Sequence, residues 1–135
     1  MGNALIDMYA KCGNVDYAYR VFCKMPQRNT VSWNSMIAGY GVHGYGNDAL
    51  TLFYQMQQIG VKPNDVTFLA VLSACSHAGL INEGWYYFNS MIRDYGISPR
   101  LDHYACMVDL LGHDGHLDEA HVLISTMSIE PDAFV

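Results

Sequence analysis

Two asparagine side chains occupy the same step of two different apolar runs. Asn3 lies in the run GNALID and Asn34 in the run SWNSMI, where the neighbouring residues are typical of a core. A carboxamide carries hydrogen-bond donors and acceptors, so it can complement the edge of an exposed nucleobase. An isolated asparagine would ordinarily cap a helix, form a turn or face solvent. The secondary structure around these two residues distinguishes the base-contacting interpretation from the capping one.

Other patterns that suggest chemistry are set aside. The letters DEAH at residues 118–121 match a helicase box, but the chain has no G-x-x-x-x-G-K-[ST] loop. Three histidines, His113, His116 and His121, lie near Cys106 in the sequence without the ligand spacing of a zinc site. No histidine is followed two places later by glutamate and no C-x-x-C pair occurs, as a zinc deaminase would need. The sequence therefore predicts no enzyme activity, no metal and no cofactor.

Charge is distributed unevenly along the 135 residues, whose net charge is −6. Residues 1–100 carry seven Lys or Arg and six acids, whereas residues 101–135 carry seven acids and no Lys or Arg. Phosphate neutralisation by Lys and Arg supplies most non-specific nucleic-acid binding, so composition by itself argues against a nucleic-acid-binding protein.

The cysteines and the lengths of the apolar runs limit the classes of protein to which the chain can belong. Four cysteines stand singly in apolar stretches, which favours buried, reduced thiols and a reducing compartment: Cys12, Cys23, Cys75 and Cys106. Apolar runs fall far short of the ~20 residues that cross a bilayer, so no membrane association is expected. No basic leader opens the chain, and we expect any targeting peptide to have been removed or to belong to a longer parent.

An internal repeat organises the whole chain. Four glycines, Gly13, Gly44, Gly79 and Gly115, follow one another at steps of 31, 35 and 36 residues. Other positions keep phase with them: Ala18, Ala49, Gly84 and Ala120 five later; Phe22, Phe53, Phe88 and Ile124 nine later; Met25, Met56, Met91 and Met127 twelve later. Periods of 20 to 50 residues indicate stacked solenoid units.

Each unit is predicted to contain two helices. Apolar residues recur at helical spacing before each glycine, as in Leu5, Ile6, Tyr9; Met36, Ile37, Tyr40; Val71, Leu72, Cys75; and Met107, Val108, Leu111. After each glycine a second stripe begins with a small residue that lets two helices approach closely. The glycine suits a left-handed helix end, and prolines follow the second helices at Pro26, Pro63, Pro99 and Pro131. The predicted fold is all-α, an α-α superhelix (solenoid) of helix-turn-helix repeats.

This pattern resembles the pentatricopeptide repeat, and the stretches LIDMYAKCG, SWNSMIAGYGVHG, TFLAVLSACSHAGLINEG and HYACMVDLLG are similar to its plant subclass of short, standard and long units. The resemblance implies a short unit at 1–29 that lacks its first two residues, so that Asn3 holds the fifth place. It also implies a standard unit at 30–64, a long unit at 65–100 and a terminal short unit at 101–132. Residues 133–135 resemble the start of the extension motif that usually follows. The chain is then expected to be a fragment of a larger protein.

The resemblance also implies a role for the asparagines. In the family, the fifth residue of a unit and its last residue address one base of single-stranded RNA, and here these pairs are Asn3 with Asn29 and Asn34 with Asn64. Asparagine at both places implies a pyrimidine, with cytosine favoured over uracil. The alternative is that these asparagines only cap helices or face solvent.

The other two units depart from this rule. Leu69 pairs with Arg100 and Ala105 with Asp132, so at most weaker RNA contacts are expected there. Val31 and Val66 occupy the second place of their units, where the family sandwiches bases, although a core valine at a helix start explains them equally well. Long units in the family often pack or dock a partner, which Val66, Phe68 and Leu69 fit as well as they fit an ordinary core.

Two functions remain. The resemblance implies sequence-selective binding of single-stranded RNA, not DNA, as part of a mitochondrial or chloroplast RNA-processing factor that specifies a cytidine for conversion to uridine. The alternative is a protein-interaction solenoid that docks an editing partner through the long unit. If the asparagines read RNA, Asn3 and Asn34 must be at least partly exposed on one surface. About eight helices should then form a right-handed arc, with the first helices on its concave face.

Overall fold

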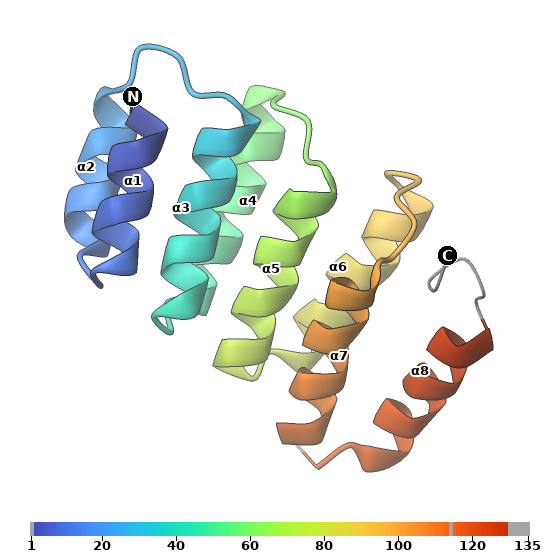
Figure 1. Cartoon of the computed structure of the whole chain (residues 1–135). Helices are drawn as coiled ribbons and strands as arrows, with labels where there is room; N and C mark the ends of the chain where they lie inside the picture. Colours follow the sequence, from blue (N-terminus) through green and yellow to red (C-terminus); the bar gives the residue numbers. More distant parts are fainter. Residues whose placement is uncertain (1, 114, 130–135) are drawn as a thin grey trace.

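The chain folds, in the computed structural model, into eight helices within the residues that the structure describes, 2–113 and 115–129. The helices are α1 (Gly2–Lys11), α2 (Val15–Lys24), α3 (Thr30–Val42), α4 (Gly46–Ile59), α5 (Asp65–Ala78), α6 (Ile81–Arg93), α7 (Leu101–His113) and α8 (Leu117–Ile129). They form four hairpins that stack side by side (Figure 1), so the predicted all-α solenoid is confirmed. Across these ranges, no helix combines the length and the apolar character that a membrane span requires.

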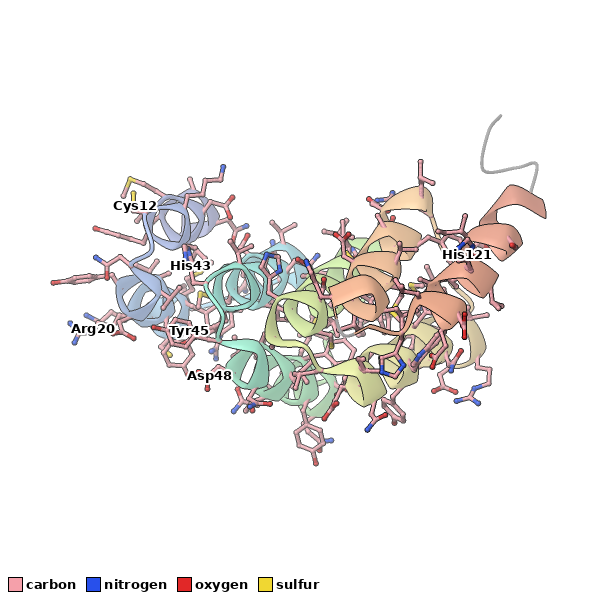
Figure 2. All side chains as sticks on the ribbon, turned by 90° about the horizontal axis from the view of Figure 1, so that it is seen from below. Cys12, Arg20, His43, Tyr45, Asp48 and His121 are labelled. Carbon is pink, nitrogen blue, oxygen red and sulfur yellow. The ribbon has the colours of Figure 1, made fainter. Side chains whose placement is uncertain are left out.

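The helices are arranged in two rows. Each first helix packs on the next first helix, α1 on α3, α3 on α5 and α5 on α7. Each of α2, α4 and α6 packs on its own partner and on the following first helix. Figure 2 shows the stack from below, with α2 and α4 beneath α1 and α3. The first helices thus pack on one another along the stack, and their place on a concave face stays a prediction. The right-handed sense of the superhelix stays a prediction.

Glycine ends the first helix of every hairpin. The φ angles of Gly13, Gly44, Gly79 and Gly115 are 82°, 86°, 71° and 79°, all in the left-handed region. A residue with a Cβ adopts this conformation at a cost, whereas glycine does so freely. The repeated glycine therefore fixes the turn that folds each second helix back on the first, as the sequence predicted.

Small residues let neighbouring helices approach closely. A Cβ added to Gly41 in α3 would lie 2.8 Å from Cβ and 3.0 Å from Cα of Ala74 in α5. Gly84 takes the place that alanine holds in the other three repeats, and a Cβ there would lie 2.5 Å from Cδ2 of Leu110. Gly41 thus allows α3 to meet the backbone of α5, and Gly84 makes room for the side chain of Leu110 from the next hairpin.

An aromatic contact joins each hairpin to the next. Rings from a second helix meet rings from the following first helix at centroid distances of 4.8 Å for Phe22–Trp33, 5.3 Å for Phe53–Phe68 and 5.6 Å for Phe88–Tyr104. These tilted and edge-on geometries are the favourable ones for aromatic pairs. The repeated phenylalanine therefore lies at the contact between hairpins, and Trp33 fills the first of these interfaces.

Four residues expected in the interior are more exposed than predicted. Leu5 is 39% exposed and Ile124 is 42% exposed, and the thiols of Cys12 and Cys23 are also exposed. Three of them lie in α1, α2 or α8 and Cys12 lies in the turn after α1, at the two ends of the described stack, where helices pack on fewer sides (Figure 2 shows Cys12 pointing outward). Cys75 is buried and Cys106 is half-buried, and burial raises the pKa of the Cys75 thiol to about 12. The prediction of buried thiols is thus wrong for Cys12 and Cys23.

The close approach of α3 and α5 gives a first testable prediction. Gly41→Ala should lower the free energy of unfolding by about 1–3 kcal/mol, because the backbone of Ala74 cannot move aside without separating the helices. Gly112→Ala is the matched control, since nothing lies within 4 Å of a Cβ at that helical position. The control should be neutral or stabilising by up to about 1 kcal/mol through helix propensity. Urea unfolding followed by circular dichroism measures both, and equal effects at the two sites would contradict the packing account.

Candidate functional site

Two of the four predicted base-reading asparagines cap helices. Asn29 is the N-cap of α3, and its Oδ1 accepts the backbone N–H of Ser32 at 3.0 Å. Asn64 is the N-cap of α5, and its Oδ1 accepts the backbone N–H of Thr67 at 3.0 Å. The backbone N–H of Asn64 donates in return to Oγ1 of Thr67 at 3.0 Å, which completes a capping box. Asn29 and Asn64 therefore cap helices, and their role in addressing a base stays a prediction.

The fifth-position asparagines meet these caps from the preceding hairpin. Ser32 Oγ lies 2.6 Å from Oδ1 of Asn3, and Thr67 Oγ1 lies 2.5 Å from Oδ1 of Asn34. Nδ2 of Asn34 also donates to Oδ1 of Asn64 at 3.2 Å. The structure thus brings each predicted pair together, Asn3 near Asn29 and Asn34 with Asn64. We call these two clusters, Asn3–Ser32–Asn29 and Asn34–Thr67–Asn64, the polar junctions.

The exposure prediction holds for one asparagine and is wrong for the other. Asn3 is half-buried, whereas Asn34 is only 7% exposed. Asn34 is covered because Thr67 and Asn64 of the following hairpin use one of its donors and one of its acceptors. In this arrangement Asn34 cannot present its full carboxamide edge to a base. In the conformation observed, this burial contradicts a reading role for Asn34, which would require the hydrogen bond from its Nδ2 to Asn64 to open.

The third junction is built differently. His103 holds the position in α7 that Ser32 holds in α3 and Thr67 holds in α5. Its imidazole is fully buried, and Nδ1 accepts the backbone N–H of Arg100 at 2.9 Å. Its Nε2 therefore carries the proton and donates to the backbone oxygen of Asp65 at 2.9 Å. Leu69, at the fifth place, is half-buried and has no polar group to join in. No carboxamide pair forms at this junction.

Arg100 is held by carboxylates on the surface. Its guanidinium lies 2.9 Å from Asp65 and 3.1 Å from Asp102. Partial burial tends to raise the pKa of Asp102, but the hydrogen bond and charge of Arg100 outweigh it, so that pKa is lowered. An open cleft of about 480 Å³ runs beside Asn64 and is lined by Lys62, Tyr95 and Arg100. With Asp65 also in its wall, this cleft carries little net charge.

The remaining candidates are placed as follows. Val31 and Val66 are 54% and 46% exposed, so their interpretation as core residues is wrong. Phe68 is fully buried, which makes it core, and Ala105 is exposed. Asp132 and residues 133–135 lie outside the described residues. Where the structure describes the chain, no three His, Cys, Asp or Glu side chains gather in a way that could hold a metal ion.

Stacked two-helix units with polar side chains repeated at successive junctions define an α-solenoid of helical-hairpin repeats. Two family models match the chain: one described as PPR repeat family over residues 28–77, and one described as PPR repeat over residues 3–30 and 66–95. The chain belongs to the pentatricopeptide repeat family.

Relatives and solved structures agree with this assignment. Pentatricopeptide repeat-containing protein At2g13600 of Arabidopsis thaliana is 54% identical over 135 residues, all of this chain and 19% of its own length. Two others from the same organism, At2g03880 (mitochondrial) and At3g49170 (chloroplastic), are 52% and 54% identical over 98% of this chain and 21% and 16% of their own lengths. The chain thus spans about a fifth of the relatives it matches.

The fold is shared with pentatricopeptide repeat protein PPR10 from maize. The match to that crystal structure covers 93% of this chain and 18% of the PPR10 chain, with a TM-score of 0.82 and 23% sequence identity. The structure of PPR10 in complex with an 18-nt psaJ RNA element matches 82% of this chain and 17% of its own with a TM-score of 0.74 at 22% identity.

Sequence reasoning missed Ser32, Thr67 and His103, which complete the three junctions. Each is the third residue of its helix, and each follows an N-cap residue or its equivalent by three positions. A capping-box pattern at these helix starts was the signal that could have found the two hydroxyls.

The capping role of Asn64 gives a second testable prediction. Asn64→Ala should lower the free energy of unfolding by about 1–3 kcal/mol, because α5 loses its N-cap and Nδ2 of Asn34 loses an acceptor. Asn64→Asp keeps an N-cap acceptor and should lie much closer to the wild type. Asn47→Ala is the control, because Asn47 is exposed and is not an N-cap. Thermal unfolding that ranks Asn64→Ala with Asn47→Ala would contradict the capping assignment.

Proposed function

We propose that this chain binds single-stranded RNA sequence-selectively, with one repeat addressing one base. The observation that carries the proposal is the repeated pairing of a fifth-position carboxamide with the asparagine that begins the next first helix, at Asn3 with Asn29 and Asn34 with Asn64. Membership of the pentatricopeptide repeat family supports it, as does the shared fold with a repeat protein whose solved complex contains RNA. The single-stranded form is proposed because only there are base edges free to be read one at a time.

The exposed valines offer the second part of a base site. Val31 and Val66 lie one residue before Ser32 and Thr67, on the helix starts that form the polar junctions. Their exposed methyl groups could pack on the faces of a base whose edge meets the carboxamide. The two asparagine pairs would select pyrimidines, whereas Leu69 and Ala105 would contribute weaker contacts.

The wider setting follows from the relatives. We place the chain in an organellar RNA-processing factor, since similar proteins are named mitochondrial and chloroplastic. Recognition of a cytidine for conversion to uridine is the specific role proposed. The 135 residues contain neither H-x-E nor C-x-x-C, so deamination would be supplied by another domain or a partner.

A protein-interaction solenoid is the second candidate. The burial of Asn34 and the absence of Lys and Arg from residues 101–135 favour it over RNA binding. Titration of labelled oligonucleotides with protein to well above micromolar concentration, followed by fluorescence anisotropy, separates the two functions. Pyrimidine-rich single-stranded RNA should bind, while DNA of the same sequence and duplex RNA should not. If none of the three nucleic acids binds, the interaction function is supported.

The strength of binding gives a third prediction. Two readers worth about 1–3 kcal/mol each supply at most about 6 kcal/mol, whereas a micromolar complex needs about 8 kcal/mol. With a net charge of −6 and few phosphate contacts, few counterions are released. The 135-residue chain should therefore bind weakly, with a shallow dependence on salt. Fluorescence anisotropy over a range of salt concentrations tests this, and tight, steeply salt-dependent binding would contradict it.

Exchange of the reading pair gives a fourth prediction. Asn34→Thr together with Asn64→Asp should move the preference at one nucleotide from pyrimidine towards guanine, as the code of the family implies. The test is a titration against four oligonucleotides that differ only at that base. Asn47→Thr serves as a control away from the junctions. An unchanged order of the four bases in a folded double variant would show that these asparagines are structural only.

A further inference from the structure

The two polar junctions share one geometry around a hydroxyl group. Ser32 Oγ lies 2.6 Å from Oδ1 of Asn3 and 3.0 Å from Oδ1 of Asn29. Thr67 Oγ1 lies 2.5 Å from Oδ1 of Asn34 and 3.0 Å from Oδ1 of Asn64. A hydroxyl has a single hydrogen, so it can donate fully to only one of its two neighbours. In both junctions the shorter distance is to the fifth-position asparagine.

The remaining hydrogen bonds decide where the proton of Thr67 goes. Oδ1 of Asn64 already accepts the backbone N–H of Thr67 and Nδ2 of Asn34. Oγ1 of Thr67 already accepts the backbone N–H of Asn64. The hydroxyl hydrogen is therefore left for Oδ1 of Asn34, which has no other donor among the hydrogen bonds of the junction.

This arrangement permits one orientation of the Asn34 amide. If the amide were flipped, its oxygen would face Oδ1 of Asn64, and two acceptors would repel each other. Its nitrogen would face the Thr67 hydroxyl, which already accepts a backbone N–H. The orientation with oxygen towards Thr67 and nitrogen towards Asn64 is thus fixed by the following hairpin. At the first junction Ser32 alone provides the hydroxyl contact to Asn3.

We propose that Ser32 and Thr67 are positioning residues for base recognition. Each hydroxyl fixes the amide orientation of the asparagine in the preceding repeat, and so determines which donor and acceptor that asparagine presents to a base. Base choice by one repeat then depends on the third residue of the next repeat. The inference rests on the proposed RNA-binding function, but the orientation of the amide can be measured without RNA.

The third junction agrees with this dependence. There the hydroxyl is replaced by His103, whose two ring nitrogens are both used by backbone groups of Arg100 and Asp65. A buried imidazole in this state has no hydrogen to offer to a fifth-position side chain, and the residue at that place is Leu69. The hydroxyl and the carboxamide are thus lost together.

The first test uses the side-chain amide of Asn34 in the absence of RNA. Thr67→Val keeps the β-branched shape and removes the hydroxyl, and Thr67→Ser keeps the hydroxyl. Thr51→Val is the control, at an exposed position of α4 where the hydroxyl donates to the backbone oxygen of Asn47. In ¹⁵N-labelled protein, Thr67→Val should raise solvent exchange of the Asn34 side-chain amide about fivefold or more. Thr67→Ser and Thr51→Val should exchange like the wild type. An unchanged amide in Thr67→Val would overturn the proposal.

The second test measures base preference with short RNAs that carry two adjacent cytosines, or one cytosine and one adenine in either order, among adenines. The wild type should prefer cytosine at each of the two places. Thr67→Val should bring the ratio of the affinities for cytosine and adenine at one place close to one, and Ser32→Ala should do so at the other place. Thr67→Ser should keep the preference of the wild type. Loss of affinity with an unchanged preference would overturn the positioning role. A wild type that binds none of the RNAs would refute the proposed function, while the amide measurement would still decide whether Thr67 orients Asn34.

Discussion

One side-chain oxygen, Oδ1 of Asn64, connects the local and the long-range structure of this repeat protein. It accepts the backbone N–H of Thr67 in the first turn of α5, and an N–H of the Asn34 side chain from the preceding hairpin. The start of a helix and the register between two hairpins therefore depend on the same group. Oδ1 of Asn29 stands at the equivalent place before α3. These two hairpins cannot slide along one another without losing the hydrogen bonds of Asn34 with Asn64 and Thr67.

This sharing has a consequence for recognition. A base that binds to Asn34 must replace the hydrogen bond that Nδ2 of Asn34 already donates to Asn64. Such exchanges contribute little net free energy, because bonds of similar strength are broken and formed. Selectivity can survive the exchange, since a wrong base would leave buried groups unpaired. The structure therefore suits discrimination between bases better than tight binding, in agreement with the scarcity of positive charge.

Much of the fold could be predicted from the sequence because it depends on local rules. The positive φ of Gly13 and Gly44 follows from a turn that only glycine enters freely, and the phase of Phe22 and Phe53 follows from helical spacing. Exposure at the ends of the stack could not be predicted in this way. The repeat pattern predicts the same burial for equivalent residues in every unit. Leu5, however, lies at an end of the described stack and is partly exposed.

The residues of the candidate site could be predicted from the sequence, but the burial and hydrogen bonding of Asn34 could not. The resemblance to the family paired Asn34 with Asn64. The burial of Asn34, however, involves Thr67, a residue 33 positions away whose hydroxyl bonds it across the interface between hairpins. A pattern within one repeat carries no information about a contact that the next repeat completes. For the same reason His103 was not recognised as the group that replaces the hydroxyl at the third junction.

The central claim is that the asparagines of the polar junctions both hold the hairpins together and contact RNA bases. The most direct measurement is a titration of ¹⁵N-labelled protein with a short single-stranded RNA that contains two adjacent cytosines, following the side-chain amides of Asn3 and Asn34. The account predicts that both resonances shift and saturate with this RNA, and remain unchanged with DNA of the same sequence. Saturable binding that leaves both side-chain amides unchanged, or equal shifts with DNA, would contradict it.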